Sequence, residues 1–127
     1  WIYKALINNV SISVVNDQIS NPTYAMHLAE AIFQCIILNA EGIYHYGSND
    51  FLSRYDFAIA MAECFKMDPN LIIPIDTEKL IQNIPSYNAK RPMHSGLKTS
   101  KIEEEIGMTT YSTDYSLNIL KKSYLSA

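Results

Sequence analysis

One short stretch of the sequence, residues 89–95 (AKRPMHS), carries side chains that could bind an anion. Pro92 disfavours helical backbone at the residue before it, so Arg91 is expected to lie on an extended loop. A guanidinium group held in this way, together with the hydroxyl of Ser95, could bind a phosphate or a carboxylate through paired hydrogen bonds. The alternative is an ordinary surface arginine in a loop that precedes a helix.

A second polar stretch runs from Asp17 to Thr23. Asn21 is predicted to cap a helix whose first residue is Pro22, because the cap side chain accepts from free N–H groups and proline needs no donor there. Asp17 fits the turn before this helix. Gln18 is left without a predicted structural role and is therefore a candidate binding residue. A solvated glutamine in a turn is the alternative.

Other kinds of chemistry lack their usual sequence patterns. The four glycines, at positions 42, 47, 96 and 107, are too dispersed for a Gly-rich phosphate loop. No Tyr-x-x-x-Lys pair occurs, and the nearest spacing, Tyr87 to Arg91, offers a guanidinium that stays charged. The three histidines have no metal-ligand spacing. The nine tyrosines could stack on a base or sugar, although most have the spacing of core or boundary residues. From its own residues, the chain is predicted to have no redox, nucleophilic or metal centre.

The composition argues against several classes of partner. The formal net charge is −3, so there is no electrostatic basis for binding nucleic acid or an anionic membrane. No apolar run approaches the ~20 residues of a membrane span, and no signal-peptide pattern is seen. Cys35 and Cys64 lie on separate apolar segments and are expected to be reduced thiols in a cytoplasmic protein.

The content of charged residues is low. It is 18%, against about 25% in typical soluble domains. A small domain has a large surface for its volume and should need more charge than average. We therefore expect part of the surface to face another protein layer. The start at Trp1 rather than at a methionine favours an excised piece of a longer protein.

Hydrophobic periodicity predicts short strands that alternate with helices. The predicted strands are 12–16, 42–48 and 71–77, and the predicted helices are about 22–39, 54–66, 77–81, 100–106 and 113–124. Ser53 is expected to cap the helix 54–66, and Ser100 with Glu103 to form a capping box. Residues 82–98 are predicted to form a loop, and Gly107 to end the helix before it.

The chain of 127 residues is long enough for one domain with a modest core. Three separated strands make too small a sheet to be stable alone. The fold class is therefore predicted to be α/β, or α+β for the chain in isolation, with strands that extend a sheet supplied from outside it. The helix 22–38 is apolar nearly all round after Ile32, which indicates burial on more than one side.

Several stretches together resemble the dTDP-4-dehydrorhamnose reductase family of extended short-chain dehydrogenase/reductases. They are SVVNDQISNPTYAMHLAEAI, GIYHYGS, SRYDFAIAMAE, IIPIDT and AKRPMHSGLKTSKIEEEIG, in the order and spacing of the family's C-terminal, substrate-binding part. The resemblance covers nearly the whole chain, from about Ile12 to Leu125. Two residues depart from it, since Arg54 and Met108 stand where tryptophan is often found.

The resemblance implies a function for the intact protein. Such enzymes reduce the 4-keto group of dTDP-6-deoxy-L-lyxo-4-hexulose with NADPH, or NADH, and give dTDP-L-rhamnose for cell-surface polysaccharide. Their catalytic and cofactor-binding residues belong to an N-terminal Rossmann domain, so none is carried over to this chain. Arg91 would contact the phosphate side of the nucleotide sugar, and Gln18, Asn21 and Ser95 would line or support the cleft. The partners implied are the nucleotide sugar and the Rossmann domain, with a homodimer as a further option.

Two alternatives remain open on the sequence. A non-catalytic regulatory protein is one, because the β subunit of methionine adenosyltransferase also resembles this branch of reductases. A fragment of a related nucleotide-sugar epimerase or dehydratase is the other. A Gly-rich loop with Tyr-x-x-x-Lys upstream would favour an enzyme, and their loss would favour the regulatory protein.

Overall fold

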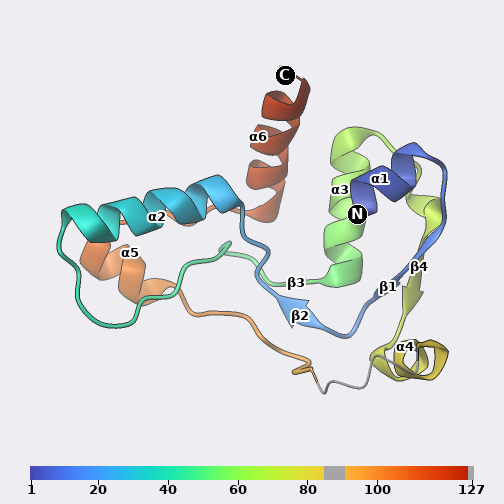
Figure 1. The fold of residues 1–127 in the computed structure, drawn as a ribbon, viewed down its shortest axis with the longest axis horizontal. Coiled ribbons are helices and arrows are strands. Elements are labelled where there is room, and N and C mark those ends of the chain that lie inside the picture. The colour runs from blue at the N-terminus through green and yellow to red at the C-terminus, as the bar shows by residue number, and fades with distance from the viewer. Residues whose placement is uncertain (85–90, 126–127) are drawn as a thin grey trace. The chain divides into compact units, whose positions relative to one another are not determined.

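The computed structural model describes residues 1–84 and 91–125 and is of the mixed α/β class (Figure 1). The chain divides into two compact units. Unit 1 comprises residues 1–20 and 52–95, and unit 2 comprises residues 21–51 and 96–127. Each unit therefore combines segments that lie far apart in the sequence.

Unit 1 is organised around a parallel pair of strands, β1 (Ile12–Val15) and β4 (Ile72–Ile75) (Figure 1). Both strands were predicted from their β-branched residues and are confirmed. Val14 and Ile72 point into the core, whereas Ile73 and Pro74 are exposed. Pro74 is opposite Val14 in the register. The strand tolerates this proline because β4 has only β1 as a neighbour in the described part of the chain.

Helix α3 (Arg54–Phe65) covers this pair, and its start was correctly predicted. The Ser53 hydroxyl accepts from the Asp56 N–H, and the Asp56 carboxylate accepts from the Ser53 N–H, which completes a capping box. The two fully buried residues of the helix, Ala58 and Ala62, are small, which allows close approach to the strand layer. The core contains Ile2, Leu6, Val14, Ala58, Ala62 and Ile72.

The remaining elements of unit 1 are short. They are α1 (Ile2–Ile7), the 3₁₀ turn η1 (Pro69–Leu71), α4 (Thr77–Asn83), and the antiparallel pair β2 (Ile19–Ser20) and β3 (Leu52–Ser53). Helix α4 was predicted as 77–81 and is slightly longer. The elements α1, β2 and β3 were not predicted from the sequence, because two-residue strands and a six-residue helix show too little periodicity. The predicted loop 82–98 lies partly outside the described residues.

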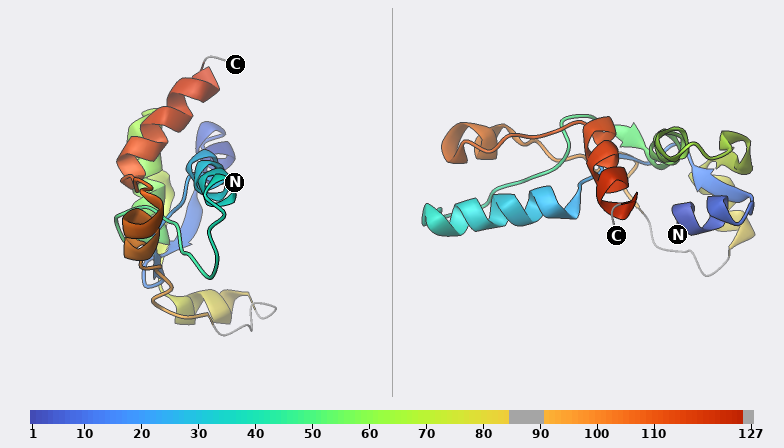
Figure 2. Two further views of the ribbon diagram at one scale, coloured as in Figure 1. Left: turned by 90° about the vertical axis from the view of Figure 1, so that its left-hand side faces the viewer. Right: turned by 90° about the horizontal axis from the view of Figure 1, so that it is seen from above.

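Unit 2 contains the helices α2 (Ala25–Ile37), α5 (Ser100–Ile106) and α6 (Thr113–Leu125). Figure 2 shows the segment 42–48 running between α2 and α5. This segment was predicted to be a strand, and that prediction is wrong for the structure described. No described residues form a strand ladder with it. It is held instead by side chains, since Tyr46 packs with Ala31 and Ile102 in the core of the unit.

Two helix starts also differ from the prediction. Helix α2 begins at Ala25 with Tyr24 at its cap position, so Asn21 is not its cap. The reason is tertiary, because the Asn21 side chain is fully engaged elsewhere in unit 2. Helix α5 has Thr99, not Ser100, at its cap position, without a cap hydrogen bond. Gly107 ends α5 in the left-handed conformation, as predicted.

The start of α6 is anchored by a carboxylate. The Thr113 N–H and hydroxyl donate to Asp50, at 2.9 and 2.8 Å. Partial burial, the largest single influence, raises the pKa of Asp50, but the hydrogen bonds from Thr113 and Ser48 outweigh it and hold this pKa below its ordinary value. Because this pKa is lowered, the ionised Asp50 carboxylate stabilises the folded chain above about pH 4. This stabilisation is lost as the pH falls through the folded-state pKa of Asp50.

We expect Asp50→Asn to lower the free energy of unfolding by about 1 kcal/mol at pH 7, since a charged acceptor becomes neutral at a partly exposed site. This difference from the wild type should shrink as the pH falls below about 4, where the carboxylate takes up its proton first in the unfolded and then in the folded chain. Urea unfolding followed by circular dichroism measures both effects. Asp114→Asn, an exposed carboxylate in the same helical turn, is the control. A difference that stays constant with pH would contradict the assignment.

Candidate functional site

The candidate site begins where the parallel strands of unit 1 end. Val15 is opposite Ile75, and the Asn16 N–H donates to the Ile75 carbonyl at 3.0 Å. The residues that follow both strands therefore leave from the same edge. In open α/β sheets, ligands bind outside the carboxyl ends of the strands. Here that edge carries Asp17 and Gln18 from one strand and Thr77 from the other.

These three residues form one hydrogen-bonded network. The Thr77 N–H donates to Asp17 Oδ2 at 2.8 Å, and the Thr77 hydroxyl donates to Asp17 Oδ1 at 2.7 Å. The Gln18 amide nitrogen donates to the Thr77 hydroxyl oxygen at 2.9 Å. Gln18 is only 4% exposed, and its backbone carbonyl accepts from the Arg54 N–H. The expectation that Gln18 has no structural contact is therefore wrong.

The loop that carries Arg91 and Ser95 is tied to the same edge. The Ile19 N–H donates to the Met93 carbonyl at 2.7 Å, and the Ser95 N–H donates to the Ile19 carbonyl at 2.9 Å. His94 thus forms an isolated parallel bridge with Ile19, the residue after Gln18. Ser95 and Arg91 are both exposed. Unit 1 therefore joins residues 93–95 to the segment at Gln18 and Ile19 through backbone pairing.

Asn21, the fourth predicted site residue, is buried in unit 2. Its amide nitrogen donates to the carbonyls of Ser48 and Leu97, both at 3.1 Å, and its oxygen accepts from the Leu97 N–H at 3.0 Å. A Cβ added at Gly47 would lie 2.4 Å from the Asn21 nitrogen, so only glycine fits there. Asn21 therefore fixes the backbone around Leu97 and is a supporting residue in this structure.

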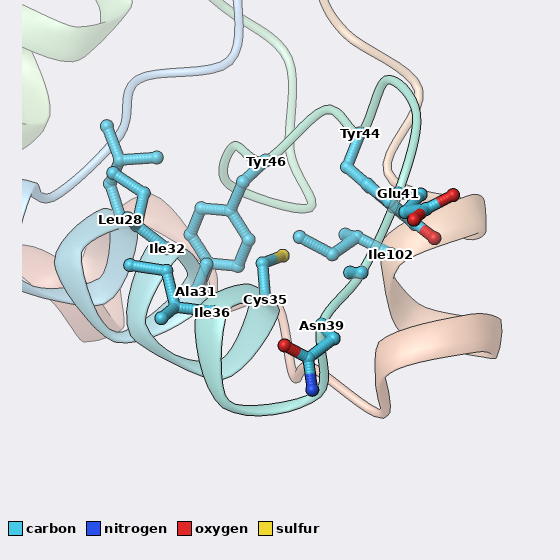
Figure 3. A pocket seen from close by; sticks show the side chains of 11 residues that line it. Leu28, Ala31, Ile32, Cys35, Ile36, Asn39, Glu41, Tyr44, Tyr46 and Ile102 are labelled. Carbon is cyan, nitrogen blue, oxygen red and sulfur yellow. The ribbon is translucent and has the colours of Figure 1, made fainter.

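A hollow of about 550 Å³ lies in unit 2 along α2 (Figure 3). Its walls include Ala31 and Cys35 of α2, Ile102 of α5, and the ring of Tyr46, which points toward α2 in Figure 3. The Tyr46 hydroxyl donates to the Thr109 carbonyl, and burial raises the pKa of this tyrosine. The walls are mostly apolar, so the hollow suits packing against other apolar groups better than binding a charged ligand.

Aromatic residues also gather in unit 2, but they contact one another. His27 lies 4.4 Å from Tyr111, and Tyr111 stacks on Tyr115 at 4.7 Å between ring centroids. Tyr24 meets His27 edge-on at 5.0 Å. These rings therefore pack as boundary residues, which was the favoured interpretation of the tyrosines in the sequence.

Residues 1–84 and 91–125 offer no metal centre. They contain no group of three His, Cys, Asp or Glu side chains that could hold a metal ion. None of their helices has both the length and the apolar character needed to cross a membrane. Cys35 and Cys64 are both half-buried. The site can therefore recognise a polar or anionic ligand through hydrogen bonds and a guanidinium group.

One contributor to the site, Thr77, was not singled out from the sequence. Its signal is its position, two residues after the strand that ends at Ile75. Asp17 is likewise two residues after Val15, and the two strands pair in parallel. The pairing could not be read from the sequence, because both strands were predicted without known neighbours.

The chain matches the family model described as the RmlD substrate binding domain over residues 2–124. It is 36% identical over 93 residues to the spore coat polysaccharide biosynthesis protein SpsK of Bacillus subtilis, covering 73% of this chain and 30% of that protein. It is 32% identical to a dTDP-4-dehydrorhamnose reductase of Aggregatibacter actinomycetemcomitans, covering 80% of this chain and 36% of that protein. It is 27% identical to methionine adenosyltransferase 2 subunit beta of Xenopus tropicalis, with 80% and 30% covered.

Solved structures show the same fold. A dTDP-4-dehydrorhamnose reductase of Clostridium acetobutylicum superposes with a TM-score of 0.82 and 28% identity, over 96% of this chain and 43% of that chain. One from Bacillus anthracis, in complex with NADP, gives a TM-score of 0.81 and 24% identity, over 99% and 42%. The chain thus spans about a third of the curated relatives and less than half of the solved structures. The chain belongs to the RmlD substrate binding domain family and corresponds to the C-terminal, substrate-binding part of an extended short-chain dehydrogenase/reductase.

Proposed function

We propose that this chain is the substrate-binding portion of an NADPH-dependent reductase that acts on the 4-keto group of a dTDP-4-dehydro-6-deoxy sugar in dTDP-L-rhamnose biosynthesis. The observation that carries the proposal is the joining of the Arg91–Ser95 stretch to the Gln18 stretch at the carboxyl edge of β1 and β4. This edge is where a parallel sheet binds ligands. The named reductases among the relatives support the choice of substrate.

Each of the four residues has a role in this proposal. Arg91 supplies a planar cation that pairs with the phosphate oxygens of the nucleotide sugar. Ser95 and Gln18 supply neutral hydrogen-bonding groups for the sugar. Asn21 does not touch the ligand but holds the backbone at Leu97, two residues after Ser95. None of them is a catalytic residue, since none acts as an acid, base or nucleophile in the proposal.

NADPH belongs, in this proposal, to a Rossmann domain of the same protein outside this chain. The chain's own residues do not form a Gly-rich phosphate loop, because the four glycines are dispersed along the sequence and two of them have no open side. The side of Gly47 is filled by Asn21, and that of Gly96 by the Phe51 ring. The B. anthracis reductase structure in complex with NADP supports the cofactor. The cytoplasm, where nucleotide sugars and NADPH are available, is the proposed location, and a homodimer the proposed assembly.

The surface of α2 supports docking of this second domain. Ile36 is 68% exposed and Phe33 is 59% exposed. The segment 42–48 has no strand partner among the described residues, although its composition predicts a strand. A sheet edge supplied by the Rossmann domain would pair this segment and cover the apolar face of α2. Both features thereby agree with the low content of charged residues, 18%.

A second candidate function is regulatory. It is supported by the 27% identity to methionine adenosyltransferase 2 subunit beta, over 80% of this chain. A regulatory homologue would use the same fold without turnover, and a nucleotide-sugar epimerase or dehydratase would act on a related substrate. The intact protein separates these classes directly. NADPH oxidation with the 4-keto sugar supports the reductase, and tight binding to a methionine adenosyltransferase without oxidation supports the regulatory protein.

One prediction of this proposal concerns Arg91. In the intact protein, Arg91→Ala should raise KM for the nucleotide sugar by about 10- to 150-fold, which corresponds to about 1.5–3 kcal/mol for a charge-assisted contact. The kcat should change little, and Arg91→Lys should recover only part of the loss because it lacks the planar fork. Lys4→Ala, an exposed cation on α1, is the control. Steady-state kinetics at varied substrate concentration measures this, and an unchanged KM would return Arg91 to an ordinary surface role.

The second prediction concerns the isolated chain. Residues 1–127 alone should give no NADPH oxidation with any nucleotide sugar, because the proposed cofactor domain lies outside them. Absorbance at the nicotinamide band, with the intact protein as the positive control, is the measurement. Turnover by the isolated chain would contradict the division of labour proposed between the two domains.

The third prediction concerns the apolar face of α2. Phe33→Asp should cost about 2–4 kcal/mol of unfolding free energy in the intact protein, where a docked domain would bury the ring. The same substitution in the isolated chain should have an effect within about 0.5 kcal/mol, because Phe33 is exposed there. Denaturant unfolding of both forms makes the comparison. Equal effects in the two forms would show that nothing docks on this face.

A further inference from the structure

The Thr77 hydroxyl has only one way to satisfy both of its partners. A hydroxyl carries a single hydrogen, and an ionised carboxylate only accepts. The hydroxyl lies 2.7 Å from Asp17 Oδ1, so its hydrogen points at Asp17. Its oxygen must then accept from Gln18, whose amide nitrogen is 2.9 Å away. The Thr77 side chain therefore determines which end of the Gln18 amide faces it.

These two hydrogen bonds determine the orientation of the Gln18 amide. The nitrogen faces Thr77, so the side-chain oxygen, Oε1, faces the other way. Oε1 accepts no hydrogen bond from residues 1–84 and 91–125. Within those residues no fully buried side-chain nitrogen or oxygen lacks a partner, so Oε1 keeps some accessible surface although Gln18 as a whole is 4% exposed. The edge thus presents one oriented acceptor on an otherwise buried side chain.

We propose that Thr77 is a positioning residue, which holds Gln18 Oε1 outward as the acceptor for a hydroxyl group of the sugar. The inference rests on the proposed function and adds to it a residue and a specified contact. A carbonyl oxygen with no donor beside it selects a ligand group that donates, which a sugar hydroxyl does and a phosphate oxygen does not. In this proposal Gln18 accepts a hydrogen bond from the sugar, whereas Arg91 binds the phosphates.

The position of Thr77 is itself rigid. Asp17 binds both its N–H and its hydroxyl, and the β1–β4 pairing continues to within a residue of Asp17 through the bond between Asn16 and Ile75. Asp76, the residue before Thr77, caps α4 by accepting from the Lys79 N–H. A donor or acceptor held on regular elements loses less freedom when a ligand binds, so the contact is preorganised.

The chain contains a matched control for this arrangement. In unit 2, Asp50 binds the N–H and hydroxyl of Thr113 at 2.9 and 2.8 Å, almost the same distances as between Asp17 and Thr77. Thr113 is also the first residue of a helix. No glutamine donates to Thr113 in the described residues. Thr113 therefore anchors a helix start to an aspartate as Thr77 does, but it does not orient a glutamine.

The test is a double-mutant cycle in the intact protein, with a dTDP-4-keto-6-deoxy sugar as substrate. Thr77→Val and Gln18→Ala should each raise KM about three- to tenfold, the effect of losing one neutral hydrogen bond, with kcat within about twofold of the wild type. The double variant should be no worse than either single one, because Thr77 acts through Gln18. Thr77→Ser should restore the wild-type KM, and Thr113→Val should lower stability without raising KM.

Three kinetic results would overturn the inference in an active wild type: an unchanged KM for Thr77→Val, multiplying effects in the double variant, or an equal rise in KM for Thr113→Val. A measurement on the unaltered protein covers the case in which Thr77→Val does not fold. The Gln18 side-chain amide signals in ¹⁵N–¹H spectra should shift when the nucleotide sugar is added, and unmoved signals would contradict the contact. A wild-type protein that turns over no such sugar would instead overturn the proposed function, and the inference with it.

Discussion

The parallel backbone pairing of β1 with β4 is the interaction on which the rest of unit 1 depends. It joins segments about 60 residues apart and sets the register from Ile12 with Ile72 to Val15 with Ile75. Helix α3 packs its small residues on this pair. Because parallel strands end at the same edge, the register also decides which polar residues meet there. A shift of one residue would turn the buried side chains outward and separate Asp17 from Thr77.

Unit 1 is held together by the backbone pairing of β1 with β4, whereas unit 2 is held together at one point by the side chain of Asn21. The Asn21 amide makes three hydrogen bonds to backbone groups of two distant segments, around Ser48 and Leu97. A buried amide that lost these partners would pay for its desolvation without return. Gly47 is the counterpart of this clamp, since a side chain there would occupy the place of the Asn21 amide. The Asn21 amide can therefore make its hydrogen bonds only because Gly47 has no side chain.

The two kinds of surface in the chain suit two kinds of contact. The carboxyl ends of β1 and β4 carry the hydrogen-bonded Asp17, Gln18 and Thr77, and the loop that pairs with Ile19 carries the Arg91 guanidinium. This chemistry suits a polar, anionic ligand. The face of α2 and the hollow beside it are apolar, a chemistry suited to protein packing. The sequence has no Gly-rich phosphate loop, so a dinucleotide would have to bind to another domain. In the proposed function, the first surface binds the ligand and the second joins another domain.

The sequence by itself determined the elements with strong local signals. The strands β1 and β4, the Ser53 capping box and the stop at Gly107 follow from β-branched residues, a cap pattern and a glycine, and no distant contact is needed to see them. The motifs around Gln18, Arg91 and Ser95 also identified the family. The tertiary structure alone decided what Asn21 and Gln18 bond to, that segment 42–48 lacks a strand partner among the described residues, and that Thr77 contacts Gln18. The physical reason is that hydrogen-bond partners 27 to 76 residues away leave no periodicity in the local sequence.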